Sequence, residues 1–189
     1  MTFGDYDLKK VTTSNNFVIN DKIATRLSLA STTRDGFSKN VVTGQDLDDA
    51  NSKGFRSDWM FNLNDTSSLR VFGQYFKVDR NGAAIRGIDD QTPGMRNLSQ
   101  DTVSQHELSS MVIAAIYESD LGFANLKAIA SIQEDDILVV RDNDRHNYLD
   151  PVLAIEGLPA GSTYQRAEFT PETSLVDTCL LYTSDAADD

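Results

Sequence analysis

A group of carboxylates and amides between Asp142 and Asn147 offers the oxygen ligands that a calcium ion prefers. The run Asp142-Asn143-Asp144-Arg145-His146-Asn147 resembles the start of an EF-hand loop. Such a loop requires Gly at its sixth position and Glu at its twelfth, where this chain has Asn147 and Leu153. The sequence therefore predicts a polar loop rather than a metal site.

Glu134, Asp135 and Asp136 are adjacent carboxylates, the residue type that supplies general acids and bases. Neighbouring side chains of a strand point to opposite faces, so the three cannot converge on one substrate. We interpret them as the polar rim where a strand leaves a membrane. The sequence predicts no catalytic residue, no metal and no cofactor, and the chain is not expected to be an enzyme.

Four arginines fall in predicted loops, where a guanidinium group can meet an anionic ligand. These weak candidates for substrate binding are Arg86, Arg96, Arg141 and Arg145. The two histidines, His106 and His146, are expected to be solvated loop residues, and their spacing gives no Ser/His/Asp arrangement.

Alternation of apolar and polar residues indicates the elements that must position these side chains. In the run from Gly54 to Leu63, the apolar residues fall on one side of a strand and the polar residues mostly on the other. The run from Leu69 to Phe76 alternates less strictly. The residues predicted to form the apolar face are Phe55, Trp59, Phe61, Leu69, Val71 and Tyr75.

Six strands are predicted, joined alternately by short and long connections. The short connections are rich in Asn, Asp and Gly, whereas the long ones cover residues 38–51, 80–106 and 135–163. Up-and-down transmembrane barrels typically have short connections at one end of the barrel and long connections at the other. The predicted strands are Leu8 to Ile19, Lys22 to Phe37, Ser52 to Leu63, Ser68 to Asp79, Glu107 to Ser119 and Phe123 to Glu134.

The segment from Glu107 to Tyr117 is a continuous apolar run that also fits a buried helix. The turn-like Asp120-Leu121-Gly122 that follows favours a strand and a hairpin. The longest uninterrupted apolar run, Met111 to Tyr117, is far shorter than the roughly 18 residues of a membrane-spanning helix. The fold class expected is therefore all-β, an antiparallel up-and-down meander.

The net charge of −12 argues against a nucleic-acid partner. Neither a basic start nor an apolar secretion segment follows Met1, so we expect the beginning of the natural chain to be missing. The sequence from Cys179 to Asp189, CLLYTSDAADD, resembles the conceptual translation of a sequencing adapter. We therefore expect residues 179–189 to be an artefact tail. The only cysteine, Cys179, belongs to this tail, so the rest of the chain contains none.

Several motifs resemble the early barrel strands of TonB-dependent outer-membrane receptors. They are YDLKKV (Tyr6 to Val11), ATRLSLASTTRDGFSKN (Ala24 to Asn40), TGQDLDDANSKGFRSDWMF (Thr43 to Phe61) and SLRVFGQYF (Ser68 to Phe76). The most specific part joins Arg34-Asp35-Gly36-Phe37 to the acidic run that begins at Gly44. Residues 1–178 are thus expected to be a partial receptor barrel of six or seven strands.

The resemblance implies a closed barrel of about 22 strands in the bacterial outer membrane, with a plug in its lumen. Such receptors take up a scarce ligand, such as a ferric siderophore, cobalamin or an oligosaccharide, with energy from the TonB complex. This chain contains neither plug nor energy-coupling box, so the segment itself is not expected to transport anything. It should form an open sheet whose apolar face contacts outer-membrane lipid.

A soluble all-β module that binds carbohydrate or another ligand remains the alternative. In such a sandwich the apolar faces of two sheets meet in a core and produce the same alternation. Burial of Phe55, Trp59 and Phe61 against a second sheet would favour this alternative, and their exposure together on a convex surface would favour the barrel.

Overall fold

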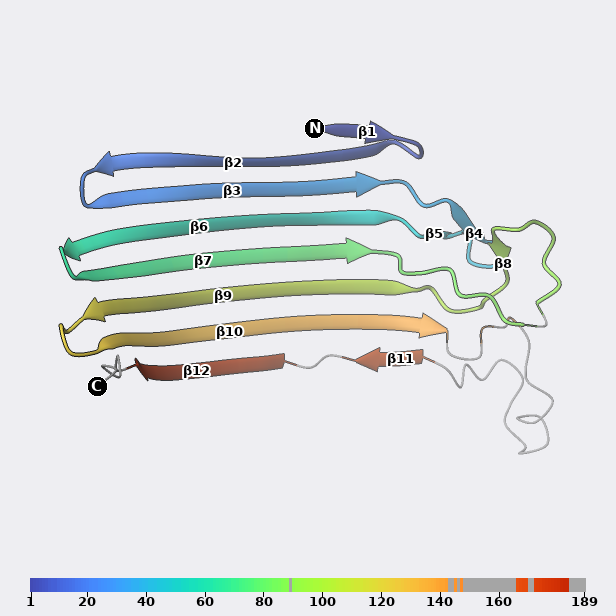
Figure 1. Cartoon of the computed structure of the whole chain (residues 1–189). Helices are drawn as coiled ribbons and strands as arrows, with labels where there is room; N and C mark the ends of the chain where they lie inside the picture. The colour runs from blue at the N-terminus through green and yellow to red at the C-terminus, as the bar shows by residue number, and fades with distance from the viewer. Residues whose placement is uncertain (89, 143–144, 146, 148–165, 170–171, 184–189) are drawn as a thin grey trace, which may run out of the picture.

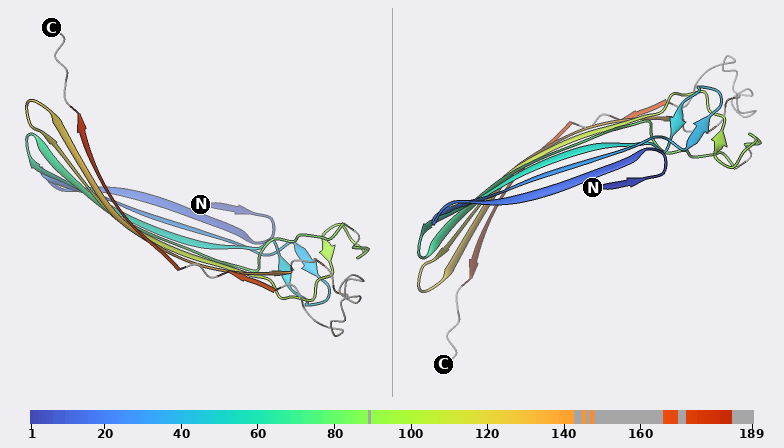
Figure 2. Two further views of the ribbon diagram at one scale, coloured as in Figure 1. Left: turned by 90° about the horizontal axis from the view of Figure 1, so that it is seen from below. Right: turned by 90° about the horizontal axis from the view of Figure 1, so that it is seen from above.

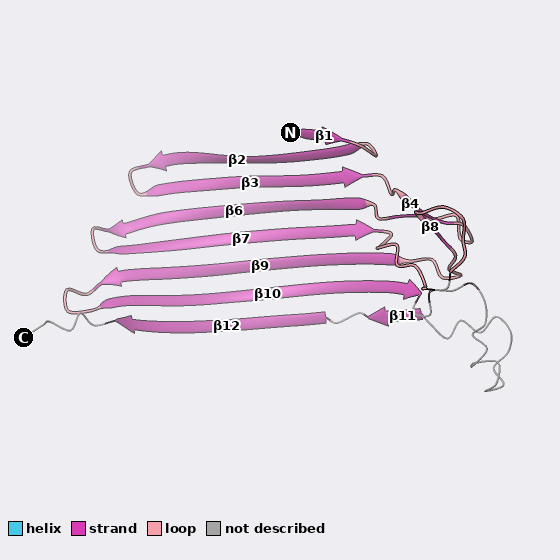
Figure 3. Cartoon of the chain, turned by 45° about the vertical axis from the view of Figure 1, so that its right-hand side comes forward, coloured by secondary structure: helices cyan, strands magenta, loops and turns pink. Residues whose placement is uncertain are grey.

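The structure, a computed structural model, describes residues 1–88, 90–142, 145, 147, 166–169 and 172–183. Within these residues the chain is all-β and contains no helix (Figure 3). No helix in this part of the chain is long and apolar enough to cross a membrane.

One antiparallel sheet of nine strands contains most of the described residues (Figure 1). The small strands β4 (Ser38–Asn40), β5 (Asp46–Leu47) and β8 (Asn97–Leu98) lie outside this sheet. From β1 to β10, the remaining strands that follow each other along the chain are neighbours in the sheet, so this part is a meander. Both β11 and β12 pair with β10. The strands are β1 (Thr2–Gly4), β2 (Leu8–Asn20), β3 (Ile23–Arg34), β6 (Ala50–Asn64), β7 (Ser67–Arg80), β9 (Gln105–Asp120), β10 (Asn125–Asp142), β11 (Arg166–Phe169) and β12 (Glu172–Thr183).

The six long strands β2, β3, β6, β7, β9 and β10 confirm the six strands predicted from alternation. The segment from Glu107 to Tyr117 lies in β9, so its strand assignment is also confirmed. The predicted end of the last strand at Glu134 is wrong, because β10 continues to Asp142. Its added residues include Ile137 to Val140, which pair with Gln105 to Leu108 of β9.

The prediction that His106 lies in a loop is also wrong, because it is the second residue of β9. Its imidazole Nδ1 lies 3.5 Å from Nη2 of Arg80 on the neighbouring strand. His146 lies outside the described residues. Cys179 to Thr183 form the end of β12, whose backbone pairs with β10. Backbone pairing uses groups that every residue carries, so a strand can form here whatever the origin of these residues.

At one end of the sheet, short turns connect neighbouring strands, and each turn contains the same type of local hydrogen bond. The side-chain oxygens of Asn20, Asn64 and Asp120 accept the backbone N–H two residues further on, at 2.9, 2.9 and 2.7 Å. This Asx geometry turns the chain within a few residues. In the third turn, Gly122 has a φ of 82°, which favours glycine.

The opposite end of the sheet carries two long connections that fold together. We call residues 35–49 and 81–104 the loop layer. It contains a small sheet in which β4 (Ser38–Asn40) pairs antiparallel with β5 (Asp46–Leu47) and parallel with β8 (Asn97–Leu98). Leu47 and Leu98 are 1% and 2% exposed, the lowest values of any described hydrophobic side chain. The best-buried part of the described chain therefore lies in the loop layer.

Buried amides connect the two halves of the loop layer. The fully buried Asn40 donates from Nδ2 to the carbonyl of Gln100 at 3.0 Å, and its Oδ1 accepts the N–H of Val42 at 3.1 Å. Gln45 and Ser104 exchange two bonds, from Gln45 Nε2 to the Ser104 carbonyl at 2.6 Å and from the Ser104 N–H to Gln45 Oε1 at 3.0 Å. Apart from the local bond of Asn40 to Val42, these bonds join residues about sixty positions apart.

The main sheet twists and bows along its length, and it is not closed (Figure 2). At one edge, β1 covers only Leu8 to Lys10 of β2. At the other edge, β11 and β12 have no further neighbour among the described residues. The sheet therefore has two open edges, as expected for a segment of meander.

Candidate functional site

The register of the main sheet places all six predicted apolar-face residues on the same side. Trp59 and Val71 are Cα partners in one cross-strand row, Phe55 and Tyr75 in a second, and Phe61 and Leu69 in a third. The rows lie two or four residues apart along the strands, so their side chains share a face. The same rows continue across β9 with Met111, Ala115 and Tyr117, and the row between them adds Ile113 and Ile132.

No second sheet covers this apolar face in the described part of the chain. Phe55 and Tyr75 are 45% and 44% exposed, and Trp59, Phe61, Leu69 and Val71 are half-buried by their neighbours on the same face. Trp59 and Phe61 stack at a centroid distance of 6.3 Å, and the indole Nε1 donates to Ser57 Oγ at 2.8 Å. The aromatic side chains thus form a surface and not a core.

The opposite face of the sheet, here called the polar face, carries charged and amide side chains together with Phe72, Phe76, Ile116 and Ile129, and a charge network lies on it. Asp58 on β6 accepts two hydrogen bonds from Arg70 on β7, from Nε at 2.8 Å and from Nη2 at 2.5 Å, and a third from Arg56 Nη2 at 3.2 Å. Arg56 also donates to Gln74 Oε1 at 3.0 Å and lies over the ring of Phe72 at 4.1 Å. The opposite charges of the residues at positions 56, 58 and 70 form the sequence pattern from which this network could have been predicted.

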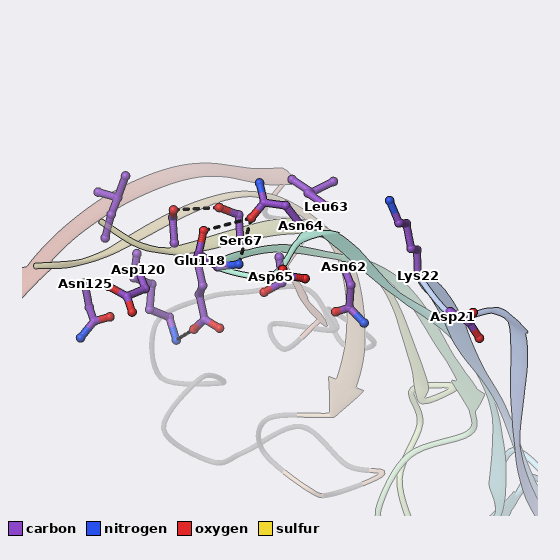
Figure 4. A pocket seen from close by; sticks show the side chains of 15 residues that line it. Asp21, Lys22, Asn62, Leu63, Asn64, Asp65, Ser67, Glu118, Asp120 and Asn125 are labelled. Carbon is purple, nitrogen blue, oxygen red and sulfur yellow. Dashed lines mark hydrogen bonds and ion pairs between the residues drawn. The ribbon is translucent and has the colours of Figure 1, made fainter. Parts of the chain in front are cut away.

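The polar face is hollowed near the short turns, where a concavity of about 1060 Å³ lies between β6, β7, β9 and β10 (Figure 4). In Figure 4, Asn62, Glu118 and Asp120 point into the hollow, whereas Leu63 points away from it. Lys127 Nζ pairs with Glu118 Oε1 at 2.7 Å at its border. At this end the polar face is concave and the apolar face convex.

Arg86 and Arg96, two of the predicted ligand-binding arginines, lie in the loop layer and have partners within the protein. Arg86 donates to the carbonyls of Asp90, Thr92 and Gly94 at 2.6–3.2 Å. Arg96 donates to the phenol oxygen of Tyr6. Its guanidinium carbon lies 5.0 Å from the Phe37 ring centroid. Both arginines hold loops in place in this structure.

Asp90, the partner of Arg86, has a buried side chain. Although burial acts to raise the pKa of this carboxyl, the pKa lies below its ordinary value. The opposing causes are hydrogen bonds from the hydroxyl and N–H of Thr92 and from the N–H of Ser99, together with the charge of Arg86. The ionised carboxylate therefore anchors this part of the loop layer.

Arg141 and Arg145, the other two predicted arginines, line one cavity of about 330 Å³. Gln100 and Ser104 of the loop layer also line it. The structure thus brings these two candidates together in one cavity, which neither Arg86 nor Arg96 lines. Most of the segment that follows Asp142 lies outside the described residues.

The metal and acid–base candidates predicted from the sequence lie only partly within the described residues. Within the described residues, no group of three or more His, Cys, Asp or Glu side chains could hold a metal ion. Asn143, Asp144 and His146 of the calcium-like run lie outside the described residues. Glu134 and Asp136 lie on the apolar face and Asp135 on the polar face, because successive β10 residues alternate.

No protein-family model, no curated protein and no solved structure matches the chain.

Proposed function

We propose that this chain is a wall segment of a larger outer-membrane β-barrel of the TonB-dependent receptor class. The observation that carries the proposal is the amphipathic sheet, in which an apolar face uncovered by the described residues backs the polar face, which is concave near the short turns. A barrel in lipid requires this arrangement, because the outside contacts hydrocarbon and the lumen is polar.

The size and borders of the apolar face support a membrane span. From the row of Phe55 to the bulge at Leu63 the strand rises about 26 Å, or about 20 Å along the axis of a barrel with strands tilted by about 40°. The row of Phe55 ends in Glu134 on β10, and the next row on the side of the loop layer carries Lys53, Lys77 and Asp136. These charges mark the expected border between hydrocarbon and headgroups.

The open edges support a larger parent barrel. An unpaired backbone amide in hydrocarbon costs several kcal/mol, so a sheet with two free edges is not stable in lipid alone. Further strands of the parent would pair with these edges and close the wall. The segment itself would then be unable to transport, and transport belongs to the parent.

The receptor assignment rests on the sequence motifs, with the loop layer as additional support. Barrels of this kind have short periplasmic turns and longer extracellular loops. On that orientation the loop layer is extracellular, and a scarce ligand such as a ferric siderophore, cobalamin or an oligosaccharide would bind on its side. Energy would come from the TonB complex in the inner membrane.

Trp59, the only tryptophan, allows a direct test of the lipid-facing surface. The chain is reconstituted with lipids that carry bromine on their acyl chains, and tryptophan fluorescence is measured. We expect strong quenching by the brominated lipids and weak quenching by aqueous iodide. The matched control combines Trp59→Phe with Phe72→Trp, which moves the indole to the polar face. For this control we expect weak quenching by the brominated lipids and strong quenching by aqueous iodide.

If the chain is instead a soluble binding module, we expect a different result. Its chain would remain soluble without lipid or detergent, and Trp59 would be shielded from both quenchers because a second sheet would cover it. That outcome would overturn the barrel proposal.

A further inference from the structure

We propose that Asn81, in the dipeptide Asn81-Gly82, is a site of spontaneous deamidation and that this modification loosens the loop layer. The dipeptide begins the second half of the loop layer, directly after the end of β7. The reaction needs no enzyme, because it uses one side chain, the neighbouring backbone amide and water. The inference goes beyond the proposed function and does not depend on which face of the sheet meets lipid.

The reaction forms a ring and then opens it. The backbone nitrogen of Gly82 gives its proton to hydroxide and attacks Cγ of Asn81. The Cγ–Nδ2 bond breaks, and the leaving nitrogen takes a proton from water and departs as ammonia. Water then opens the resulting succinimide ring at either carbonyl group, which leaves aspartate or isoaspartate at position 81. In total one water is consumed and one ammonia released, without oxidation or reduction.

The surroundings of Gly82 favour the attack. Glycine has no side chain to obstruct the approach to Asn81, and its φ of 95° lies in a region that glycine adopts readily. Within the described chain the N–H of Gly82 donates no hydrogen bond, so no bond has to break before the nitrogen reacts. Apart from chain neighbours, a Cβ at Gly82 would meet only Ser104 Cβ, at 3.7 Å. Asn81 lines a hollow of about 650 Å³ through which water can reach it.

A second dipeptide of this kind, Asp35-Gly36, is held more tightly. Aspartate before glycine can form the same ring with loss of water. A Cβ at Gly36 would lie 2.6 Å from the carbonyl oxygen of Leu47, so the backbone has little room to rearrange. Asp35 is also fixed, because its N–H donates to the carbonyl of Tyr6 at 2.8 Å. The packing therefore favours reaction at Asn81 over reaction at Asp35.

Deamidation would act on contacts that join the two halves of the loop layer. Asn81 donates from Nδ2 to the carbonyl of Asp46 and from its N–H to Oδ1 of Asp49, both at 2.8 Å. Beside them, the N–H of Asp48 donates to the carbonyl of Gly82 at 2.9 Å. The reaction removes the Nδ2 donor and adds a carboxylate to the hollow that Asp46 and Asp49 already line, where like charges repel.

Mass spectrometry of the tryptic peptide from Asn81 to Arg86 tests the site. The folded chain is held in detergent at mildly alkaline pH, sampled over days and digested briefly. Asn51 in β6 is the internal control, because Ser52 after it carries a side chain and pairs with both neighbouring strands. We expect Asn81 to convert about tenfold faster or more, since glycine leaves the attack unobstructed. Equal conversion of both asparagines, or conversion of Asn81 in urea but not in the folded chain, would overturn the proposal.

Asn81→Asp reproduces one product and tests the consequence. We expect amide hydrogen exchange at Asp48 to accelerate about threefold or more, the effect of weakening one hydrogen bond. The matched control is Asn97→Asp, which removes a local bond to the carbonyl of Pro93 and should leave the exchange at Asp48 unchanged. Equal exchange at Asp48 in the two variants would overturn the loosening of the loop layer.

Discussion

Arg70 binds Asp58 across neighbouring strands through two hydrogen bonds, at 2.8 and 2.5 Å, and this pair organises the polar face of the sheet. The Asp58 side chain is 14% exposed, whereas that of Arg70 is 42% exposed. The carboxylate is therefore the more buried member of the pair, and its loss removes the acceptor of both Arg70 hydrogen bonds and one of the two acceptors of Arg56.

Asp58→Asn should destabilise the sheet by about 1–3 kcal/mol, because charge-assisted hydrogen bonds to both arginines are weakened. Trp59 fluorescence during urea unfolding measures the change. The matched control is Asp79→Asn on β7, since Asp79 is exposed and should change stability little. Equal unfolding midpoints for the two variants would contradict a stabilising role for the network.

Gly36→Ala should loosen the loop layer. A Cβ at Gly36 would lie 2.6 Å from the Leu47 carbonyl oxygen and 2.9 Å from the Asp46 carbonyl carbon, so β5 would have to move. Gly73→Ala is the control, because a Cβ there meets nothing within 4 Å. Limited trypsin digestion at Lys39 should become faster in Gly36→Ala alone. Unchanged digestion of Gly36→Ala would show that β5 adapts without cost.

Alternation predicted the long strands because each long strand carries its own pattern. The small sheet could not be predicted in this way, since β4, β5 and β8 contain only two or three residues each. The pairing of Lys39 with Asn97 depends on contacts between distant segments. The end of β10 was missed because three carboxylates resemble a strand end, while the pairing with β9 carries the strand past them.

The candidate site was predicted less completely than the fold. Loop position alone cannot tell whether an arginine is free for a ligand, and Arg86 is engaged by three backbone carbonyls. Asp58 was assigned correctly to the polar side of its strand, but its two arginine partners depend on the register between β6 and β7. The sequence pattern predicts on which face of the sheet a side chain lies, whereas the register between strands determines which side chains it contacts.

Acid should release the part of the loop layer that Asp90 anchors. The folded pKa of Asp90 lies below its ordinary value, so the stabilisation is fully present above about pH 4 and is lost as the pH falls through the folded pKa. Amide hydrogen exchange at Thr92 and Ser99, corrected for the intrinsic rate, should therefore accelerate below about pH 4. In Asp90→Asn the exchange should be fast at neutral pH and lack this acid transition. The same transition in both variants would exclude Asp90 as its origin.

A lysine should act differently on the two faces of β9. Ile113 is 46% exposed on the apolar face, and its neighbour Val112 lies on the polar face between Gln74 and Gln133. A lysine on the lipid side of a barrel costs about 2–4 kcal/mol near the bilayer midplane, whereas a lumen-facing lysine stays solvated. Ile113→Lys should reduce the fraction of chain that floats with lipid vesicles in a density gradient by tenfold or more. Val112→Lys should float nearly as the unmodified chain does. If both variants float equally, the apolar face of β9 does not contact lipid.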